Sequence, residues 1–207
     1  MRNISNAPLR FLFLTLFAVA FGVEEAIVVV YLRLIPAQHG QIAPDTYPIE
    51  IGREICTIVV LVCVASIAGA RPIERLRHFF VAFGVWDIIY YVALWGLSGN
   101  PTFNSDDVLF LIPIPWVGPV WAVMAFATAL VLLGAFGIAA RRAWVLIVGL
   151  LLGWLSFVYV PFASLVSGQG FHMRLQLEPS LYPLWLFVPA IACVLLALPL
   201  PARSRQA

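Results

Sequence analysis

Acidic side chains inside long apolar runs are the residues of this sequence best suited to chemistry. Glu24 and Glu25 interrupt the first apolar run, and Asp87 lies near the centre of the third. A charged side chain at the centre of a membrane helix costs at least about 2.5–3.5 kcal/mol, so such residues are functional candidates by default. Proton relay, ion binding and a polar substrate pocket are the uses we consider.

Spacing along the chain groups several of these residues. Positions 50, 53 and 54 stand at i, i+3 and i+4, so they share one face of a helix, and Asp87 has two tyrosines at the same separations. Asp107 directly precedes a proline-rich stretch. The predicted ion cluster or binding site comprises Glu24, Glu25, Glu50, Arg53, Glu54, Asp87, Tyr90, Tyr91 and Asp107.

The charge balance of this set leaves two interpretations open. A buried carboxylate must be neutralised, and Arg53 can hold two of them through its planar fork. It cannot neutralise all of the acids together, so at least one should take up a proton, face water or bind a cation. The alternative is a salt-bridge network that fixes helix register and has no further use.

The amino-acid composition indicates that most of the chain is surrounded by lipid. The sequence is 63% hydrophobic and 11% charged, whereas a soluble domain has about 25% charged residues. The net charge of +2 is too small to indicate a nucleic-acid partner. All 12 basic residues are arginine, which excludes a lysine Schiff base or a lysine nucleophile. Histidines and cysteines are scattered, so we assign no metal, cofactor or catalytic residue.

Apolar runs of sufficient length predict an all-α, polytopic membrane helix bundle forming one domain over residues 1–207. About 20 apolar residues cross a bilayer. Six runs reach that length: residues 11–34, 47–70, 78–97, 108–140, 143–166 and 181–200.

The fourth run is too rich in proline to form one helix. Pro113, Pro115 and Pro119 each lack a backbone donor, which predicts a break near residues 113–119. One interpretation is a short membrane-dipping segment at 108–112 followed by a true span from about Gly118. The other is a helix that begins within the membrane interface.

The distribution of arginine predicts orientation. With both termini in the cytoplasm, nine arginines fall on the cytoplasmic side and three on the outer side, as the positive-inside rule requires. We therefore expect a multi-pass protein of the cytoplasmic (inner) membrane.

An internal match links the first and third runs. Residues 19–23 and 81–85 both read VAFGV, an offset of 62 residues that also aligns Glu25 with Asp87. A true duplication would produce three tandem helical hairpins, a parallel repeat found in some transporters. Chance similarity between apolar segments is the other explanation.

Two motifs resemble a family of uncharacterised bacterial multi-spanning membrane proteins. They are WDIIYY at residues 86–91 and LFLIPIPWVGPV at 109–120, and the residues Glu50, Arg53 and Glu54 are similar to that family's pattern. The resemblance covers residues 21–120 and implies a membrane location and fold. No activity is implied. Asp106 stands where the family tends to have tryptophan, so a contact of that ring would be missing.

Three classes of function fit this sequence. The favoured one is a small transporter or proton- or ion-coupled carrier that uses the carboxylate–arginine cluster, which predicts a cavity reaching Asp87. A non-catalytic membrane subunit or assembly factor predicts a dry, fully paired charge cluster. A membrane-embedded enzyme acting on a lipid or quinone, which we favour less, predicts a carboxylate pair open to lipid. Expected partners are membrane lipid and either further copies of this chain or a larger membrane complex.

Overall fold

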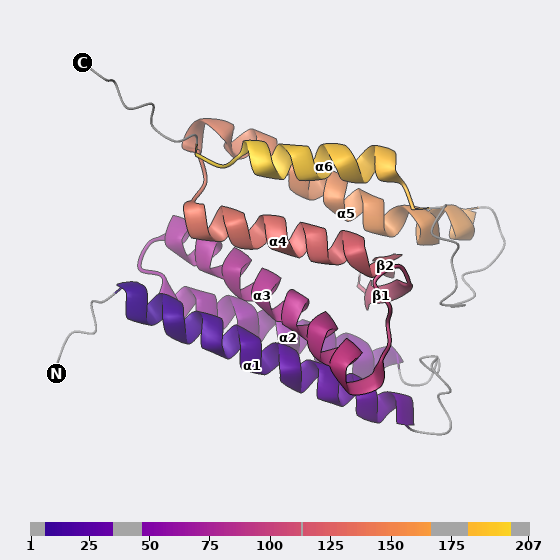
Figure 1. Cartoon of the computed structure of the whole chain (residues 1–207). Helices are drawn as coiled ribbons and strands as arrows, with labels where there is room; N and C mark the ends of the chain where they lie inside the picture. The colour runs from indigo at the N-terminus through magenta and orange to yellow at the C-terminus, as the bar shows by residue number, and fades with distance from the viewer. Residues whose placement is uncertain (1–6, 35–46, 113, 167–181, 200–207) are drawn as a thin grey trace, which may run out of the picture.

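A computed structural model describes residues 7–34, 47–112, 114–166 and 182–199. Over these ranges the chain is mostly helical, and all the helices run roughly along one axis (Figure 1). The six α-helices are α1 Ala7–Leu34, α2 Tyr47–Ala68, α3 Pro72–Ser98, α4 Val120–Phe136, α5 Ala143–Val166 and α6 Leu184–Leu196. Two short strands, β1 Asp106–Phe110 and β2 Trp116–Pro119, precede α4, and a short 3₁₀ turn, η2 Ala140–Arg142, precedes α5.

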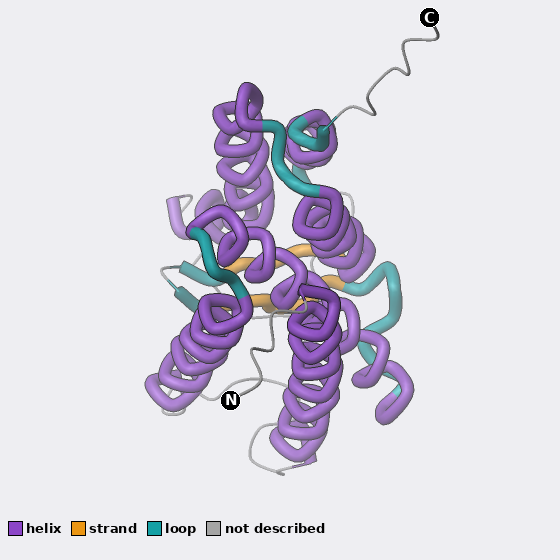
Figure 2. The backbone as a smooth tube through the Cα atoms, turned by 90° about the vertical axis from the view of Figure 1, so that its left-hand side faces the viewer, coloured by secondary structure: helices purple, strands orange, loops and turns teal. Residues whose placement is uncertain are grey.

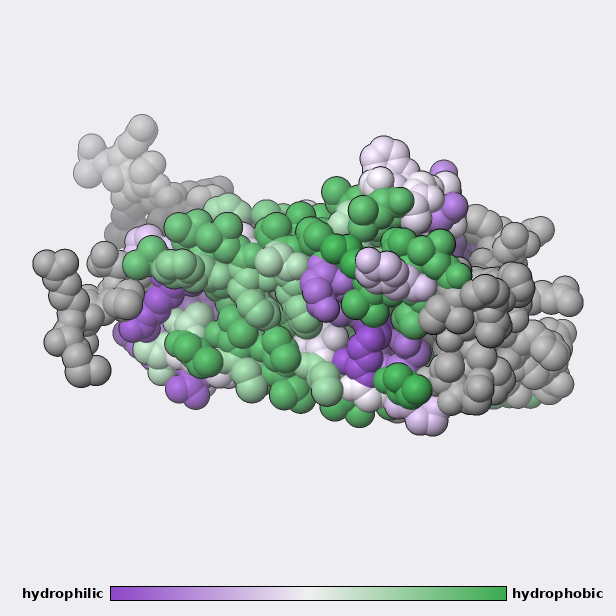
Figure 3. Space-filling model, turned by 90° about the horizontal axis from the view of Figure 1, so that it is seen from below, coloured by the Kyte–Doolittle hydropathy of each residue, from purple (hydrophilic) through white to green (hydrophobic). Residues whose placement is uncertain are grey.

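Among the described residues, four segments are long and apolar enough to cross a membrane: Ala7–Leu32, Tyr47–Ala68, Pro72–Ser98 and Ala140–Ala163. The face on which α1 and α2 lie is largely hydrophobic, with a hydrophilic patch toward the strands (Figure 3). Together these features indicate a membrane-embedded protein. The other two helices, α4 and α6, are shorter, with 17 and 13 residues.

Helix α3 is the central element of the bundle. It packs extensively against α1 and α4 and also contacts α2, while α5 packs against α6. The α3–α4 contact is close because Gly84 and Gly134 face backbone: a Cβ added to either would lie 2.5 Å from a carbonyl oxygen. Helix α1 contacts α3 far more than its chain neighbour α2. The arrangement of three tandem hairpins therefore stays a prediction.

Arginines close several helix ends at the end of the bundle opposite the strands. Arg77 donates to the carbonyl oxygens of Gly134 and Ala135 at the end of α4, at 3.0 and 2.9 Å. Arg142 donates to Leu196 O, at the end of α6, at 2.8 Å. The last carbonyls of a helix lack intrahelical donors and carry partial negative charge. The two guanidinium groups therefore stabilise the C-terminal ends of α4 and α6. We call this the arginine end of the bundle.

The fourth apolar run is divided into a β-hairpin and a helix. Strands β1 and β2 pair antiparallel, with Asp107 opposite Gly118 and Phe110 opposite Trp116. Helix α4 then begins after Pro119. The predicted break in this run is confirmed, and its physical reason is that proline cannot donate a hydrogen bond within a helix. The pairing of the two strands was not predicted. Pro113 lies outside the described residues.

The hairpin is surrounded by helices. Seen along the bundle, the two strands lie near its centre (Figure 2). The Phe110 ring packs against Phe83 and Trp86, both at 6.3 Å between ring centroids, and these residues lie in the middle of α3. Non-helical backbone at such a depth is stable only where protein covers it or a polar cavity receives it.

Candidate functional site

A cavity of about 520 Å³ lies between the hairpin and the helices. Side chains from α1, α2, α3, α4, α5 and the hairpin line it. Its volume is within the range of small-molecule sites, roughly 300–1,000 Å³. Its polar lining comes from α1, α2, α3 and β1, and its apolar lining also includes α4 and α5.

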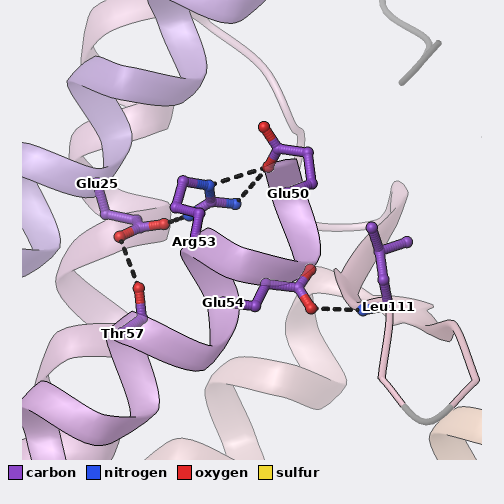
Figure 4. A network of polar contacts seen from close by, with 6 residues as sticks. All are labelled: Glu25, Glu50, Arg53, Glu54, Thr57 and Leu111. Atoms are coloured by element: carbon purple, nitrogen blue, oxygen red, sulfur yellow. Dashed lines mark hydrogen bonds and ion pairs between the residues drawn. The ribbon is translucent and has the colours of Figure 1, made fainter. Parts of the chain in front are cut away.

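Arg53 is held between two carboxylates on one side of the cavity (Figure 4). Its guanidinium forms an ion pair with Glu25 of α1 and another with Glu50, one turn earlier on α2, at 2.9 Å. Glu25 also accepts a hydrogen bond from the Thr57 hydroxyl at 3.4 Å. Both glutamates are buried, at 6% and 7% exposure. Arg53 therefore joins α1 to α2 and shares its single positive charge between these two acids.

Glu54 makes a different contact. Its carboxylate accepts a 2.8 Å hydrogen bond from the backbone N–H of Leu111, directly after β1 (Figure 4). The Leu111 donor has no place in the strand ladder, because the pairing ends at Phe110. A buried amide without an acceptor costs about 1–3 kcal/mol, so Glu54 satisfies a group that the hairpin turn leaves free.

Asp87 lies near the centre of α3, fifteen residues after Pro72 and eleven before Ser98. It lines the cavity and is half-buried. Within the described ranges its carboxylate forms no hydrogen bond and no ion pair. The like charge of Asp107 acts on this carboxylate.

Asp107 reaches the cavity from β1. Its carboxylate accepts a 3.0 Å hydrogen bond from the N–H of Val108. The preceding residue, Asp106, does not line the cavity, as expected from the alternation of side chains along a strand. Thus the hairpin contributes one carboxylate to the site.

Aromatic rings form much of the wall beside these acids. Trp86 and Tyr90 stack with centroids 6.4 Å apart, and Tyr90 meets Tyr91 edge-on at 4.9 Å. On the hairpin side, Phe110 packs against Trp116 at 5.4 Å. All five line the cavity. The indole N–H of Trp86, a residue only 6% exposed, has no hydrogen-bond partner in the described structure.

The charges of the cavity are unbalanced. Five carboxylates line it and the only basic residue among its described lining is Arg53. Arg53 pairs with Glu25 and Glu50, and its positive charge also acts on Glu54, whereas Asp87 forms no ion pair with a described residue. A carboxylate such as Asp87, without a described ion pair in a largely apolar cavity, is suited to taking up a proton.

The chain matches no protein-family model, no curated protein and no solved structure. The resemblance drawn from the WDIIYY and LFLIPIPWVGPV motifs therefore stays an expectation.

The structure brings together eight of the nine residues in the predicted cluster. The ninth, Glu24, is exposed and does not line the cavity, because it follows Val23 on the outward face of α1 while Glu25 points inward. Sequence reasoning missed Thr57, the Leu111 amide and the aromatic wall. Thr57 could have been predicted, because helical spacing places it one turn after Arg53. The Leu111 amide and the aromatic wall could not, because both depend on the hairpin. The described residues contain no group of three His, Cys, Asp or Glu that could hold a metal ion.

Proposed function

We propose that this protein is a small membrane carrier that couples movement of a solute to proton binding at intramembrane carboxylates. The observation that carries the proposal is the cavity that reaches Asp87 near the middle of a membrane-length helix. A binding site at mid-depth, inside a bundle, is the arrangement that a carrier needs to receive a solute from either side.

The state of Asp87 favours this function over a purely structural one. A membrane subunit whose charges serve only to fix helix register should have every carboxylate paired. Arg53, Glu25 and Glu50 fit that description, and Asp87 does not, since it borders the cavity without a described hydrogen bond or ion pair. A carboxylate in this position can exchange a proton for a solute because no residue in the described part of the chain forms an ion pair with it.

The proposal includes six spans with both termini in the cytoplasm of a bacterial cell. The arginine end collects the connections from α2 to α3 and from α4 to α5, which supports one basic, cytoplasmic face. Helix α4, at 17 residues, is about 26 Å long, so the hairpin before it would supply the remaining depth of a 30 Å core.

The test is proton-linked flux in proteoliposomes. Purified protein is reconstituted with a trapped pH-sensitive dye, a proton gradient is imposed, and a panel of solutes is added: Na⁺, K⁺, organic cations, neutral sugars and amino acids. We expect at least one solute to collapse the gradient faster than in protein-free liposomes. The Asp87→Asn variant should lose this flux, because an amide cannot exchange a proton in this pH range.

Asp106→Asn is the matched control. It also replaces an aspartate by asparagine, but Asp106 does not line the cavity, although its neighbour Asp107 does. It should retain the wild-type flux. Equal flux in wild type, Asp87→Asn and empty liposomes across the whole panel would overturn the carrier function and favour a subunit.

A further inference from the structure

We propose that the cavity binds a lipid-soluble quinone, a neutral flat ring with two carbonyl oxygens and a hydrocarbon tail, taken up from the bilayer. This inference goes beyond the proposed carrier function and does not depend on it. Its first support is a pair of hydrogen-bond donors. Trp86 and Trp116 both line the cavity, and the indole N–H of each is buried without a hydrogen-bond partner in the described structure. Native proteins leave few buried donors unpaired, so each such group needs an explanation.

The two indoles belong to the same part of the wall, where α3 meets the hairpin. The Phe110 ring packs against both, with centroid distances of 6.3 Å to Trp86 and 5.4 Å to Trp116. An indole N–H can only donate, so a carbonyl oxygen satisfies it and a cation does not. A ring with two carbonyl oxygens can supply an acceptor to each indole.

The wall around these donors favours a flat, neutral ring. Trp86 stacks with Tyr90 at 6.4 Å between centroids, and Tyr90 meets Tyr91 edge-on at 4.9 Å. Such rings pack well against another flat π system, either offset-stacked or edge-to-face. An anionic lipid head group is disfavoured, because the only basic residue in the described lining, Arg53, already pairs with two glutamates.

The remainder of the cavity is suited to a hydrocarbon tail. The lining along α3 runs from Phe79 to Tyr91, twelve residues or about 18 Å. Toward the arginine end the described lining is apolar and includes Phe80, Leu130 and Leu150. A ring without a tail would leave this part of the cavity unused, whereas a tail would bury apolar surface there.

The arrangement of the helices provides a route from the bilayer. Helices α2 and α5 both line the cavity, with Ile58 on α2 and Trp154 on α5, yet within the described ranges they make little direct contact with each other. They lie on the same side of the α3–α4 pair, behind it in Figure 1. Ile58 and Trp154 are only half-buried. We assign the space between these two helices as the entry for the ligand, because in a membrane this side of the bundle meets lipid.

The test uses three probes that share parts of one molecule. Decyl-trimethylbenzoquinone has the ring, the carbonyl oxygens and the tail; decyl-trimethylbenzene lacks the carbonyl oxygens; tetramethylbenzoquinone lacks the tail. Binding to purified protein in detergent is measured by isothermal titration calorimetry, with protein-free micelles as the baseline. We expect the long-tailed quinone to bind at least about tenfold more tightly than either of the others, because hydrogen bonds and tail burial both contribute.

Two variants test the indole donors. Trp86→Phe and Trp116→Phe each remove the N–H and keep an aromatic ring. Each should weaken binding of the long-tailed quinone by about three- to tenfold, the loss of one hydrogen bond, and leave binding of decyl-trimethylbenzene nearly unchanged. Trp95→Phe is the matched control, because Trp95 is exposed on the same helix as Trp86 and does not line the cavity. The readout is the ratio of the two affinities, which a general loss of stability does not mimic.

Each part of the inference has an outcome that would overturn it. Equal binding of the long-tailed quinone and decyl-trimethylbenzene, or an unchanged ratio in both variants, would remove the quinone as the ligand. Equal binding of the two quinones would overturn uptake from the bilayer. The comparison of probes on the wild-type protein holds even if a variant does not fold. Quinone binding without proton-linked flux would keep this inference and overturn the carrier, whereas flux without quinone binding would do the reverse.

Discussion

The carboxylate of Glu54 on α2 accepts a hydrogen bond of 2.8 Å from the backbone N–H of Leu111 at the turn of the hairpin. This contact joins residues 57 positions apart and places an acidic side chain where the strand ladder has ended. The same contact satisfies a buried amide and holds the hairpin against the cavity wall. Its loss should therefore affect both stability and the position of the hairpin.

Glu54→Ala should destabilise the protein by about 1–3 kcal/mol, because it leaves the Leu111 amide without its acceptor. Glu54→Gln should cost less, since the amide oxygen can accept the same bond. Hydrogen exchange followed by mass spectrometry should show faster exchange around Leu111 in Glu54→Ala only. Glu24→Ala, at an exposed position on α1, is the control. Unchanged exchange at Leu111 in Glu54→Ala would contradict this role.

Arg53→Ala should cost about 3 kcal/mol, the lower end of the range for breaking a buried pair, because 30% of its side chain remains exposed. Its removal leaves Glu25 and Glu50 buried without a counter-charge. Denaturant unfolding in detergent measures the loss, and a double-mutant cycle with Glu25→Ala isolates the pair.

The control for this loss is Arg71→Ala, which removes a surface ion pair with Glu74 and should cost less than about 1 kcal/mol. The Arg71 side chain is 79% exposed, so solvent screens its interaction. Equal losses for the two arginines would show that the Arg53 cluster contributes no more than a surface pair.

Gly84→Ala should destabilise the bundle by about 1–3 kcal/mol, the usual cost of overpacking. The added methyl would lie 2.5 Å from the carbonyl oxygen of Ala127, so α3 and α4 would have to separate. Gly96→Ala on the same helix has open space around its Cβ and should leave stability unchanged or slightly higher. Thermal unfolding of the two variants makes the comparison, and a reversed order would refute the close α3–α4 contact.

Reporter fusions test the proposed orientation. A fusion after Pro101 should report the outer side and one after Arg142 the cytoplasm, as the arginine distribution predicts. The reverse pattern would refute the orientation and with it the cytoplasmic position of the arginine end. Two fusions reporting the same side would refute a span formed by α4.

Several features of this protein were determined by the sequence alone. Apolar runs with a 20-residue length fix where helices form, because backbone groups in lipid must be satisfied within the helix. Helical spacing placed Glu50, Arg53 and Glu54 on one face, and the structure places all three at the cavity. The prolines of residues 113–119 indicated where helix formation fails, since they remove donors whatever the surroundings.

Other features were decided only by tertiary structure. The sequence offered Arg53 several acids. The tertiary arrangement placed Glu25 of α1 beside Arg53, while the outward direction of Glu24 removed it from the site. The pairing of β1 with β2 and the bond from Leu111 to Glu54 depend on contacts between distant segments, which local spacing does not encode. The sequence already made Asp87 a candidate proton or ion site, but only the structure shows that Asp87 borders a cavity, because a cavity is a property of packing between elements.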